Sequence, residues 1–245
     1  AVAGTLRTIS PATWDRFLEH AGPLLPKKWR VTTPGDKAHK LADVLLQPNG
    51  HAFFLNATSQ WKDPANIVRG ASEPSTLLTN ADAWPNTGNL AQWMMAMDAQ
   101  SYLPDDILVK VDRAAMANSL ETRVPMLDHR VVELAWRLPL HQKIRQGQGK
   151  WLVRQVLYRH VPKELVERPK MGFAVPLDSW LRGPLREWAE TLLDENRLRQ
   201  EGYFDPAPIR QKWDEHLSGR RNWQHALWTV LMFQAWLEAS RRLSL

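Results

Sequence analysis

The stretch from Asn222 to Arg242, NWQHALWTVLMFQAWLEASRR, carries the clearest structural pattern of the chain. Leu227 and Leu231 lie four residues apart, as the apolar side of an α-helix requires. Trp228 and Trp236 place large apolar side chains on the remaining surface of the same helix. Because a helix that is apolar nearly all round is buried on most sides, this stretch predicts a central helix of the fold.

Helical spacing of apolar residues extends outward from this stretch over most of the chain. The pattern predicts further helices at about 10–22, 38–47, 104–118, 131–138, 152–157, 177–193 and 206–217. No alternation of period two persists long enough to indicate a sheet. The sequence therefore predicts an all-α fold.

Residues 70–88 interrupt this helical pattern. They are rich in Ser, Thr, Asn and Pro and show no clean period, which predicts a long irregular connection. We take the connection as the boundary between two domains. The expected domains are an N-terminal helical cap, residues 1–88 with its linker at about 70–88, and a helical body, residues 89–245.

The composition excludes several classes of protein. The 245 residues include no Cys, which excludes a disulfide scaffold, a thiolate zinc site and a Cys nucleophile within the chain. No apolar stretch approaches the ~18 to 20 residues that span a bilayer, and no signal peptide is indicated. We therefore expect a cytoplasmic protein without membrane contacts.

The formal charge of +6 favours anionic ligands. The basic residues are dispersed, however, and form no polybasic tract. The tryptophans of the last helix are core residues by default, not a stacking platform for bases. We therefore expect no nucleic-acid partner, although a basic helical nucleic-acid-binding module remains a rival interpretation. Salt-dependent binding to random DNA or RNA would support that rival.

The first segment with residues suited to chemistry reads LPDDILVKVDRAAMA at 103–117 and SLETRVPMLDH at 119–129. On a helical wheel Asp112 lies beside Leu108, which predicts partial burial and a need for a cationic partner, Arg113 or Arg123. Glu121 lies in the same loop as Arg123. The pattern fits two interpretations, a salt-bridge cluster that pins a loop or a functional site.

The second segment reads RPKMGFAVP at 168–176. Lys170 follows a proline, which disfavours helix, and precedes Gly172, which lets the backbone approach a ligand closely. A lysine on such a loop suits an anionic phosphate as a point charge. Taken alone, the same lysine also fits an ordinary exposed surface residue.

Both segments resemble the synthetase domain of the glutamine-dependent asparagine synthetases. The resemblance is carried by YLPDDILVKVDR at 102–113, LETRVPMLDH at 120–129 and RPKMGF at 168–173. Weaker similarity at 34–41 and 61–64 extends it over nearly the whole chain. The β-lactam synthetases share this domain.

The resemblance implies a reaction. ATP and Mg²⁺ activate the side-chain carboxylate of aspartate as an acyl-adenylate, and ammonia released from glutamine displaces AMP to give asparagine. The residues that match the family pattern are Lys170 and Glu121 as catalytic candidates, with Asp112, Arg113 and Arg123 as substrate-positioning candidates. No metal ligand is expected among the residues of this chain.

The resemblance is also incomplete. The chain contains neither the Ser-Gly-Gly-x-Asp-Ser pyrophosphate loop nor the metal-contacting segment of the family, and it has no Cys for the glutaminase step. We therefore expect the helical C-terminal portion of an ATP-pyrophosphatase-type (adenine nucleotide α-hydrolase-like) synthetase domain whose nucleotide-binding α/β part is missing. Such a portion should be inactive alone and hold no cofactor by itself.

Its expected partners are ATP, aspartate and ammonia as small-molecule substrates, and the nucleotide-binding and glutaminase segments of the same enzyme. A homodimer is compatible with this interpretation. Two further alternatives stay open: an amidotransferase of the same family that acts on another carboxylate, and a non-catalytic interaction module that retains the fold.

Overall fold

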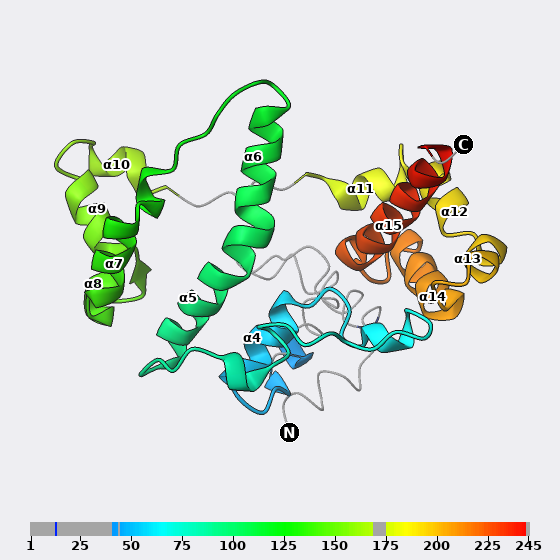
Figure 1. The fold of residues 1–245 in the computed structure, drawn as a ribbon, viewed down its shortest axis with the longest axis horizontal. Helices are drawn as coiled ribbons and strands as arrows, with labels where there is room; N and C mark the ends of the chain where they lie inside the picture. The colour runs from blue at the N-terminus through cyan, green and yellow to red at the C-terminus, as the bar shows by residue number, and fades with distance from the viewer. Residues whose placement is uncertain (1–12, 14–40, 44, 169–174, 244–245) are drawn as a thin grey trace. The chain divides into compact units, whose positions relative to one another are not determined.

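The computed structural model describes residue 13 and residues 41–43, 45–168 and 175–243 (Figure 1). Most of these residues are helical, and within them the strands are limited to β1 (Ile144–Arg145) and β2 (Gln148–Gly149), which pair antiparallel. The predicted all-α fold is therefore confirmed. Apart from Thr13, the helix predicted at 10–22 lies outside the described residues, as do residues 169–174 of the Lys170 segment.

The chain divides into two compact units. Unit 1 combines the residues up to Ser75 with those from Val175 onward, and unit 2 runs from Thr76 to Ala174. Residues 71–80 contain no helix or strand, as expected for the irregular connection. The domain boundary expected near residue 88 stays a prediction.

Unit 1 contains the two longest of the described helices, α14 and α15. In chain order, the α-helices of this unit from Gly50 onward are α4 (Gly50–Thr58), α11 (Leu177–Arg182), α12 (Arg186–Leu192), α13 (Glu195–Glu201), α14 (Pro206–Leu217) and α15 (Gln224–Leu243). Asp205 caps α14 by accepting a hydrogen bond from the Ala207 amide, and Pro206 occupies the first helical position. The predicted extent of this helix, 206–217, is confirmed.

Two helix boundaries in unit 1 differ from the sequence-based prediction. The helix predicted at about 38–47 ends before Asn49 as expected, but α4 begins directly after that residue, where no helix was predicted. The Asn49 side chain caps α4 by accepting a hydrogen bond from the Ala52 amide at 2.9 Å. The helix predicted over 177–193 is two helices, α11 and α12, separated at Gly183 and Pro184. Proline lacks the amide hydrogen that would continue α11, so the chain turns there.

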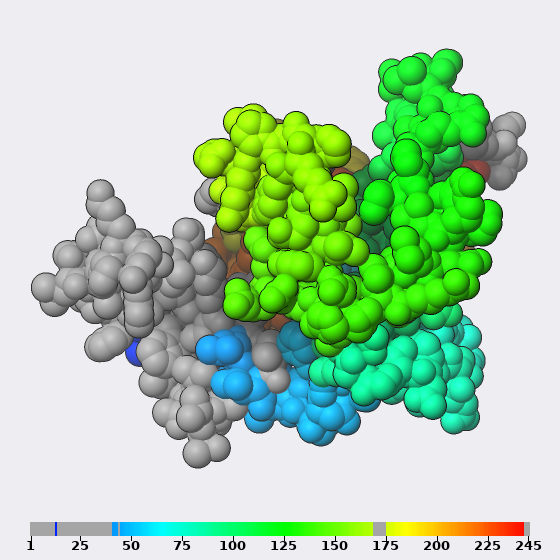
Figure 2. Space-filling view, turned by 90° about the vertical axis from the view of Figure 1, so that its left-hand side faces the viewer, coloured from blue at the N-terminus to red at the C-terminus, as the bar shows by residue number. Residues whose placement is uncertain are grey.

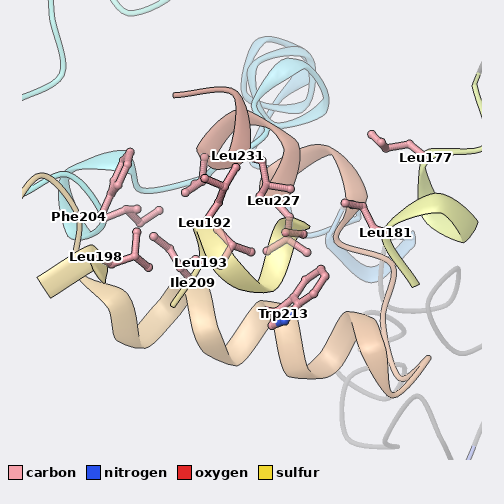
Figure 3. Packing of buried hydrophobic residues seen from close by; sticks show 13 residues of the cluster. Leu177, Leu181, Leu192, Leu193, Leu198, Phe204, Ile209, Trp213, Leu227 and Leu231 are labelled. Carbon is pink, nitrogen blue, oxygen red and sulfur yellow. The ribbon is translucent and has the colours of Figure 1, made fainter. Parts of the chain in front are cut away.

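The hydrophobic core lies in unit 1, between α11, α12, α14 and α15 (Figure 3). Leu181, Leu193, Ile209 and Trp213 are fully buried within it. From α15 the core receives Leu227, Val230 and Leu231. The apolar stripe that identified this helix in the sequence is therefore the face that packs on its neighbours.

α15 is buried on one face only, and the prediction that it is buried on most sides is wrong. Trp228 is half-buried against Trp188, with ring centroids 6.0 Å apart. Met232 and Trp236 are exposed, and 61% of Trp236 is accessible. The helix supplies one wall of the core, because the described helices cover its other side only in part.

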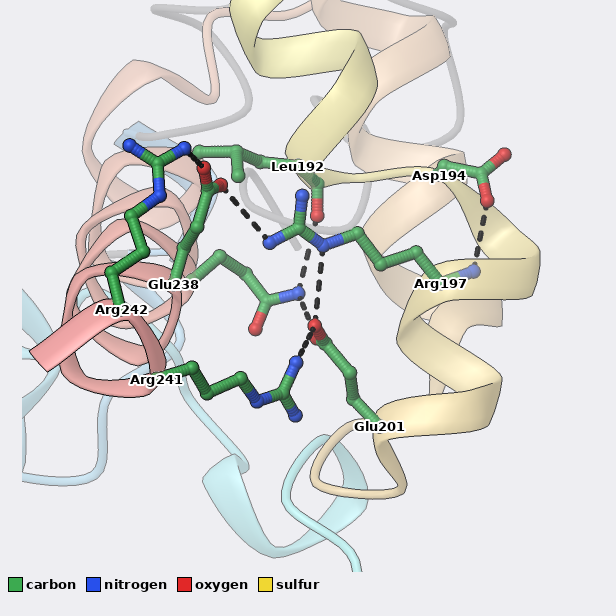
Figure 4. A network of polar contacts seen from close by, with 8 residues as sticks. Leu192, Asp194, Arg197, Glu201, Glu238, Arg241 and Arg242 are labelled. Atoms are coloured by element: carbon green, nitrogen blue, oxygen red, sulfur yellow. Dashed lines mark hydrogen bonds and ion pairs between the residues drawn. The ribbon is translucent and has the colours of Figure 1, made fainter. Parts of the chain in front are cut away.

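Polar contacts fasten α13 to α15 (Figure 4). Glu201, 8% exposed at its side chain, accepts hydrogen bonds from Arg197 at 3.2 Å, Arg241 at 3.0 Å and the buried amide of Gln234 at 2.6 Å. Arg197 also pairs with Glu238 on α15 at 3.3 Å. The end of α13 is thus tied to the second half of α15.

The segment after α4 contacts residues that are far away in the sequence. The indole nitrogen of Trp61 donates to the Ala226 carbonyl at 2.9 Å. Val68 forms a β-bridge with Phe204. These contacts join residues 61–68 to the C-terminal helices.

Unit 2 contains shorter helices. They are α5 (Leu90–Gln100), the π-helical turn η5 (Leu103–Leu108), α6 (Val109–Met116), α7 (His129–Arg137), α8 (Leu140–Lys143), α9 (Trp151–Leu157) and α10 (Lys163–Val166). β1 and β2 lie between α8 and α9. Their turn residues Gln146 and Gly147 both have positive φ, at 51° and 76°, which matches the twist of a two-residue hairpin.

Candidate functional site

α6 ends in a defined turn that starts the Glu121 loop. Ser119 has φ of 57°, in the left-handed region, and its amide donates to the Met116 carbonyl at 2.9 Å. The Leu120 amide donates to the Ala115 carbonyl at 3.0 Å. This pair of bonds is the Schellman arrangement, which satisfies the last carbonyls of the helix and fixes the direction in which the chain leaves it.

Asp112 and Arg113 lie on α6, in its first and last turn respectively. Both are exposed, so the partial burial expected for Asp112 is wrong. Its apolar neighbour Val109 is itself 37% exposed and shields little of the carboxylate. Among the described residues, neither side chain makes an ion pair with Glu121 or Arg123.

Glu121 and Arg123 do come together. Their carboxylate and guanidinium are 2.8 Å apart, and the side chains are 69% and 81% exposed. An exposed pair of this kind contributes little to stability. Both groups therefore remain accessible to a ligand, and the loop that carries them is held by its ends, at α6 and at Pro125.

Asp128 has a structural role at the far end of the loop. Its side chain accepts from the Arg130 amide at 2.9 Å, which caps α7, and from the Arg130 guanidinium through both oxygens. These hydrogen bonds from Arg130 hold the pKa of the Asp128 carboxyl below its usual range. The loop carries two acidic residues, Glu121 and Asp128. Asp128 caps a helix, whereas Glu121 does not.

Lys170 lies outside the described residues. Glu167, three residues before it in the sequence, is described. The Glu167 carboxylate accepts hydrogen bonds from Arg154 on α9, from Tyr158 at the C-cap of α9 and from Gln148 on β2. The hydrogen bond from Tyr158 lowers the Glu167 pKa most, and Arg154 adds to it. The chain is thus anchored to α9 and the hairpin three residues before Lys170.

Sequence reasoning missed this anchor. Arg154 and Tyr158 are four residues apart and so face the same side of α9, which is a readable signal. Their partner Glu167 could not be identified from spacing, because it follows a further helix, α10. A second missed feature is a cavity of about 780 Å³ in unit 1, which lies apart in sequence from both motifs.

The described residues hold no cluster of three or more His, Asp or Glu side chains that could bind a metal ion. No helix in this part of the chain is long and apolar enough to cross a bilayer.

Comparison with known proteins places these motifs in one family. The family model described as asparagine synthase matches residues 5–238. No solved structure gives a significant match to the chain.

Several curated proteins are similar over more than half of the chain. A Mycobacterium bovis protein, provisionally named a glutamine-hydrolysing asparagine synthetase, is 42% identical over 145 residues, 58% of this chain and 22% of its own length. Asparagine synthetase (glutamine-hydrolysing) 1 of Bacillus subtilis is 34% identical over 143 residues, again 58% and 22%. The human asparagine synthetase is 29% identical over 157 residues, 56% and 27%. The chain thus spans about a fifth to a quarter of the length of these relatives.

Proposed function

The chain belongs to the asparagine synthase family, and on that premise we propose that it forms the helical C-terminal part of an ATP-dependent ligase that converts aspartate to asparagine. The match over residues 5–238 carries this proposal, because it includes both motif segments in their expected order. In the proposed reaction ATP adenylates the aspartate side chain, and ammonia from glutamine displaces AMP.

In this proposal Lys170 and Glu121 are the catalytic residues. Adenylation builds negative charge on the departing pyrophosphate, and the ammonium of Lys170 would stabilise that charge more in the transition state than in the ground state. Attack by ammonia then generates a cationic centre and a proton. Glu121, exposed on its loop, can stabilise the cation and accept the proton.

Asp112, Arg113 and Arg123 are proposed to position the substrates. The 2.8 Å contact between Arg123 and Glu121 supports a paired role, because the guanidinium can orient the carboxylate until substrate arrives. Asp112 and Arg113 stand exposed on α6, one turn or more before the loop. In this proposal the nucleotide-binding segments of the same enzyme hold ATP and Mg²⁺, and this chain contributes Lys170 to the departing pyrophosphate.

Exposed apolar side chains on unit 2 support the proposal that other segments of the enzyme pack against this unit. Six of its aliphatic and Met side chains are more than half exposed: Met116, Leu120, Met126, Leu134, Val156 and Leu165. Figure 2 shows one face of these segments in green and yellow-green. Such side chains would be shielded from water if another protein segment covered them. The nucleotide-binding and glutaminase segments of the same enzyme are the proposed occupants.

Pyrophosphate release and asparagine formation, measured separately, test the proposal. The chain alone should release no pyrophosphate from ATP and aspartate. In the complete enzyme, Lys170→Ala should slow pyrophosphate release by about 10²-fold or more, while Lys163→Ala, a matched exposed lysine, should not. Glu121→Gln should slow amide formation more than adenylation.

Three outcomes would contradict the proposal. Aspartate-dependent pyrophosphate release by the chain alone would show that the site is complete here. Normal release by Lys170→Ala would make that lysine a surface residue. Equal loss of both half-reactions in Glu121→Gln would assign Glu121 to the salt bridge with Arg123. A panel of other carboxylic acids in the same assay identifies the true acceptor.

A further inference from the structure

A second candidate site lies in unit 1, away from the Glu121 loop in sequence. It is a cavity of about 780 Å³, formed by α4, the segment 59–67, α14 and the loop between α14 and α15. This volume falls within the range of small-molecule sites, roughly 300 to 1,000 Å³. Its apolar lining comes from Phe53, Trp61, Ile67, Pro208 and Trp223.

Two tryptophans form fixed aromatic walls. The Trp61 indole nitrogen donates to the Ala226 carbonyl at 2.9 Å and lies 3.1 Å from the Thr229 hydroxyl. The Trp223 indole nitrogen donates to Glu215 at 2.6 Å. Because both rings are tied through their N–H groups, their faces are held in place before any ligand arrives.

Lys212 extends from α14 between these rings. Its Nζ lies 3.4 Å from the centroid of Trp223 and 5.0 Å from that of Trp61. Cation–π contact stabilises the ammonium in part, but no described residue accepts a hydrogen bond or ion pair from it. An ammonium has three N–H donors, so Lys212 retains capacity for an anionic acceptor.

The carboxylates around the cavity are engaged elsewhere. Asp43 pairs with Lys62 at 2.9 Å, and Asp63 accepts a hydrogen bond from the Asn66 side chain. Glu215 accepts from Trp223 and, at 3.2 Å, from Gln211. None of them lies within ion-pair distance of Lys212.

The electrostatic surroundings agree with this geometry. Burial lowers the pKa of Lys212, and the positive charges of Arg221 and Lys62 lower it further, against a smaller opposing effect of Glu215. Arg221 itself stacks on Trp223, 4.4 Å from the ring centroid. An anion in the cavity would relieve the repulsion among these cations.

We propose that this cavity binds a small organic anion, a carboxylate or phosphate group on a planar apolar body, with Lys212 as the contact for the anionic group. The planar body would lie against the apolar lining, next to Trp61 and Phe53. The side-chain amides of Asn56 and Gln60 line the same cavity and can orient further polar groups.

Binding of simple aromatic anions tests this site. Benzoate and phenyl phosphate, added to the whole chain at low ionic strength, should shift the indole N–H resonances of Trp61 and Trp223 saturably, and neutral benzamide should not. Trp61→Phe and Trp223→Phe assign the two resonances among the thirteen tryptophans. The two probes also show whether carboxylate or phosphate is preferred.

Lys212→Gln should weaken binding about tenfold or more, because it removes a charge-assisted hydrogen bond. Lys143→Gln is the matched control, since Lys143 also stacks on a tryptophan, 4.9 Å from the Trp136 centroid, but lies outside the cavity. If Lys212→Gln lowers the unfolding temperature, Lys212→Met keeps the aliphatic stem and removes the charge. Absence of saturable binding up to about 10 mM, equal binding of benzamide, or equal weakening by Lys143→Gln would overturn the proposal.

Discussion

His216 on α14 is a fully buried side chain whose protonation the fold resists. Its Nδ1 accepts a hydrogen bond from the Trp223 amide at 3.2 Å, so the proton of the neutral ring sits on Nε2, 3.7 Å from Asp178. Burial lowers the His216 pKa, Arg182 lowers it further, and Asp178 opposes both. The neutral ring is therefore the form that the folded chain accommodates.

Folding stability should consequently fall in mild acid. The unfolded chain protonates His216 below about pH 6.5, whereas the folded chain does so only at lower pH. The contribution is thus complete above pH 6.5 and is lost as the pH falls towards the folded-state pKa. Urea unfolding at pH 7.5, 6.5 and 5.5 should show a steeper decline for the wild type than for His216→Gln. Parallel declines would exclude His216 as the cause.

The sequence pattern predicted an ion pair within one loop correctly, but it predicted the burial of a side chain wrongly. The Glu121–Arg123 contact joins residues two apart on a short loop, so local spacing sufficed to suggest it. Asp112 was expected to be partly buried because its helical neighbours are apolar. That inference fails where the neighbours are exposed too, since burial depends on what packs against the helix.

At the scale of elements, the two faces of α15 should respond differently to truncation. Leu231→Ala removes a fully buried side chain and should lower the free energy of unfolding by about 2 to 5 kcal/mol. Trp236→Ala, on the exposed face, should cost less than about 0.5 kcal/mol. Denaturant unfolding of both variants gives the comparison. Similar losses at the two positions would mean that both faces are packed.

The junction of α13 with α15 provides a second comparison. Glu201→Ala removes one acceptor of the buried Gln234 amide, which keeps the Leu192 carbonyl, and the shared partner of Arg197 and Arg241, of which Arg197 keeps Glu238. The loss should destabilise the chain by roughly 1 to 3 kcal/mol. Glu195→Ala removes an exposed pair with Arg199 on the same helix and should cost less than about 1 kcal/mol. Chemical denaturation gives the free energy of unfolding of both variants. A larger loss for Glu195→Ala than for Glu201→Ala would refute a stabilising role for the network.

At the scale of the molecule, the two units differ in how much they bury. The hydrophobic core lies in unit 1, whereas the buried residues described in unit 2 are Trp93, Ala96 and Met97. Amides of α14 and α15 should therefore exchange hydrogen more slowly than those of α7 and α9. Mass spectrometry of exchange reads this directly, and addition of the proposed partner segments should protect unit 2. Equal exchange in both units would contradict the difference in packing.

The helical class was predictable because apolar spacing is a local property, and α14 was placed to the residue. The sequence could not show which segments of the chain combine to form unit 1. The bond between Trp61 and Ala226 joins residues 165 apart, and no spacing rule connects them. The cavity around Lys212 depends on the same long-range pairing, which explains why only the structure revealed it.

The discontinuous make-up of unit 1 also sets an order of events during synthesis on the ribosome. Trp61 and Val68 emerge early, but their partners Ala226 and Phe204 follow only after all of unit 2 has been translated. At about 5 to 20 residues per second, the roughly 100 residues of unit 2 delay that meeting by roughly 5 to 20 seconds. The contacts that join the two parts of unit 1 can therefore form only after this interval.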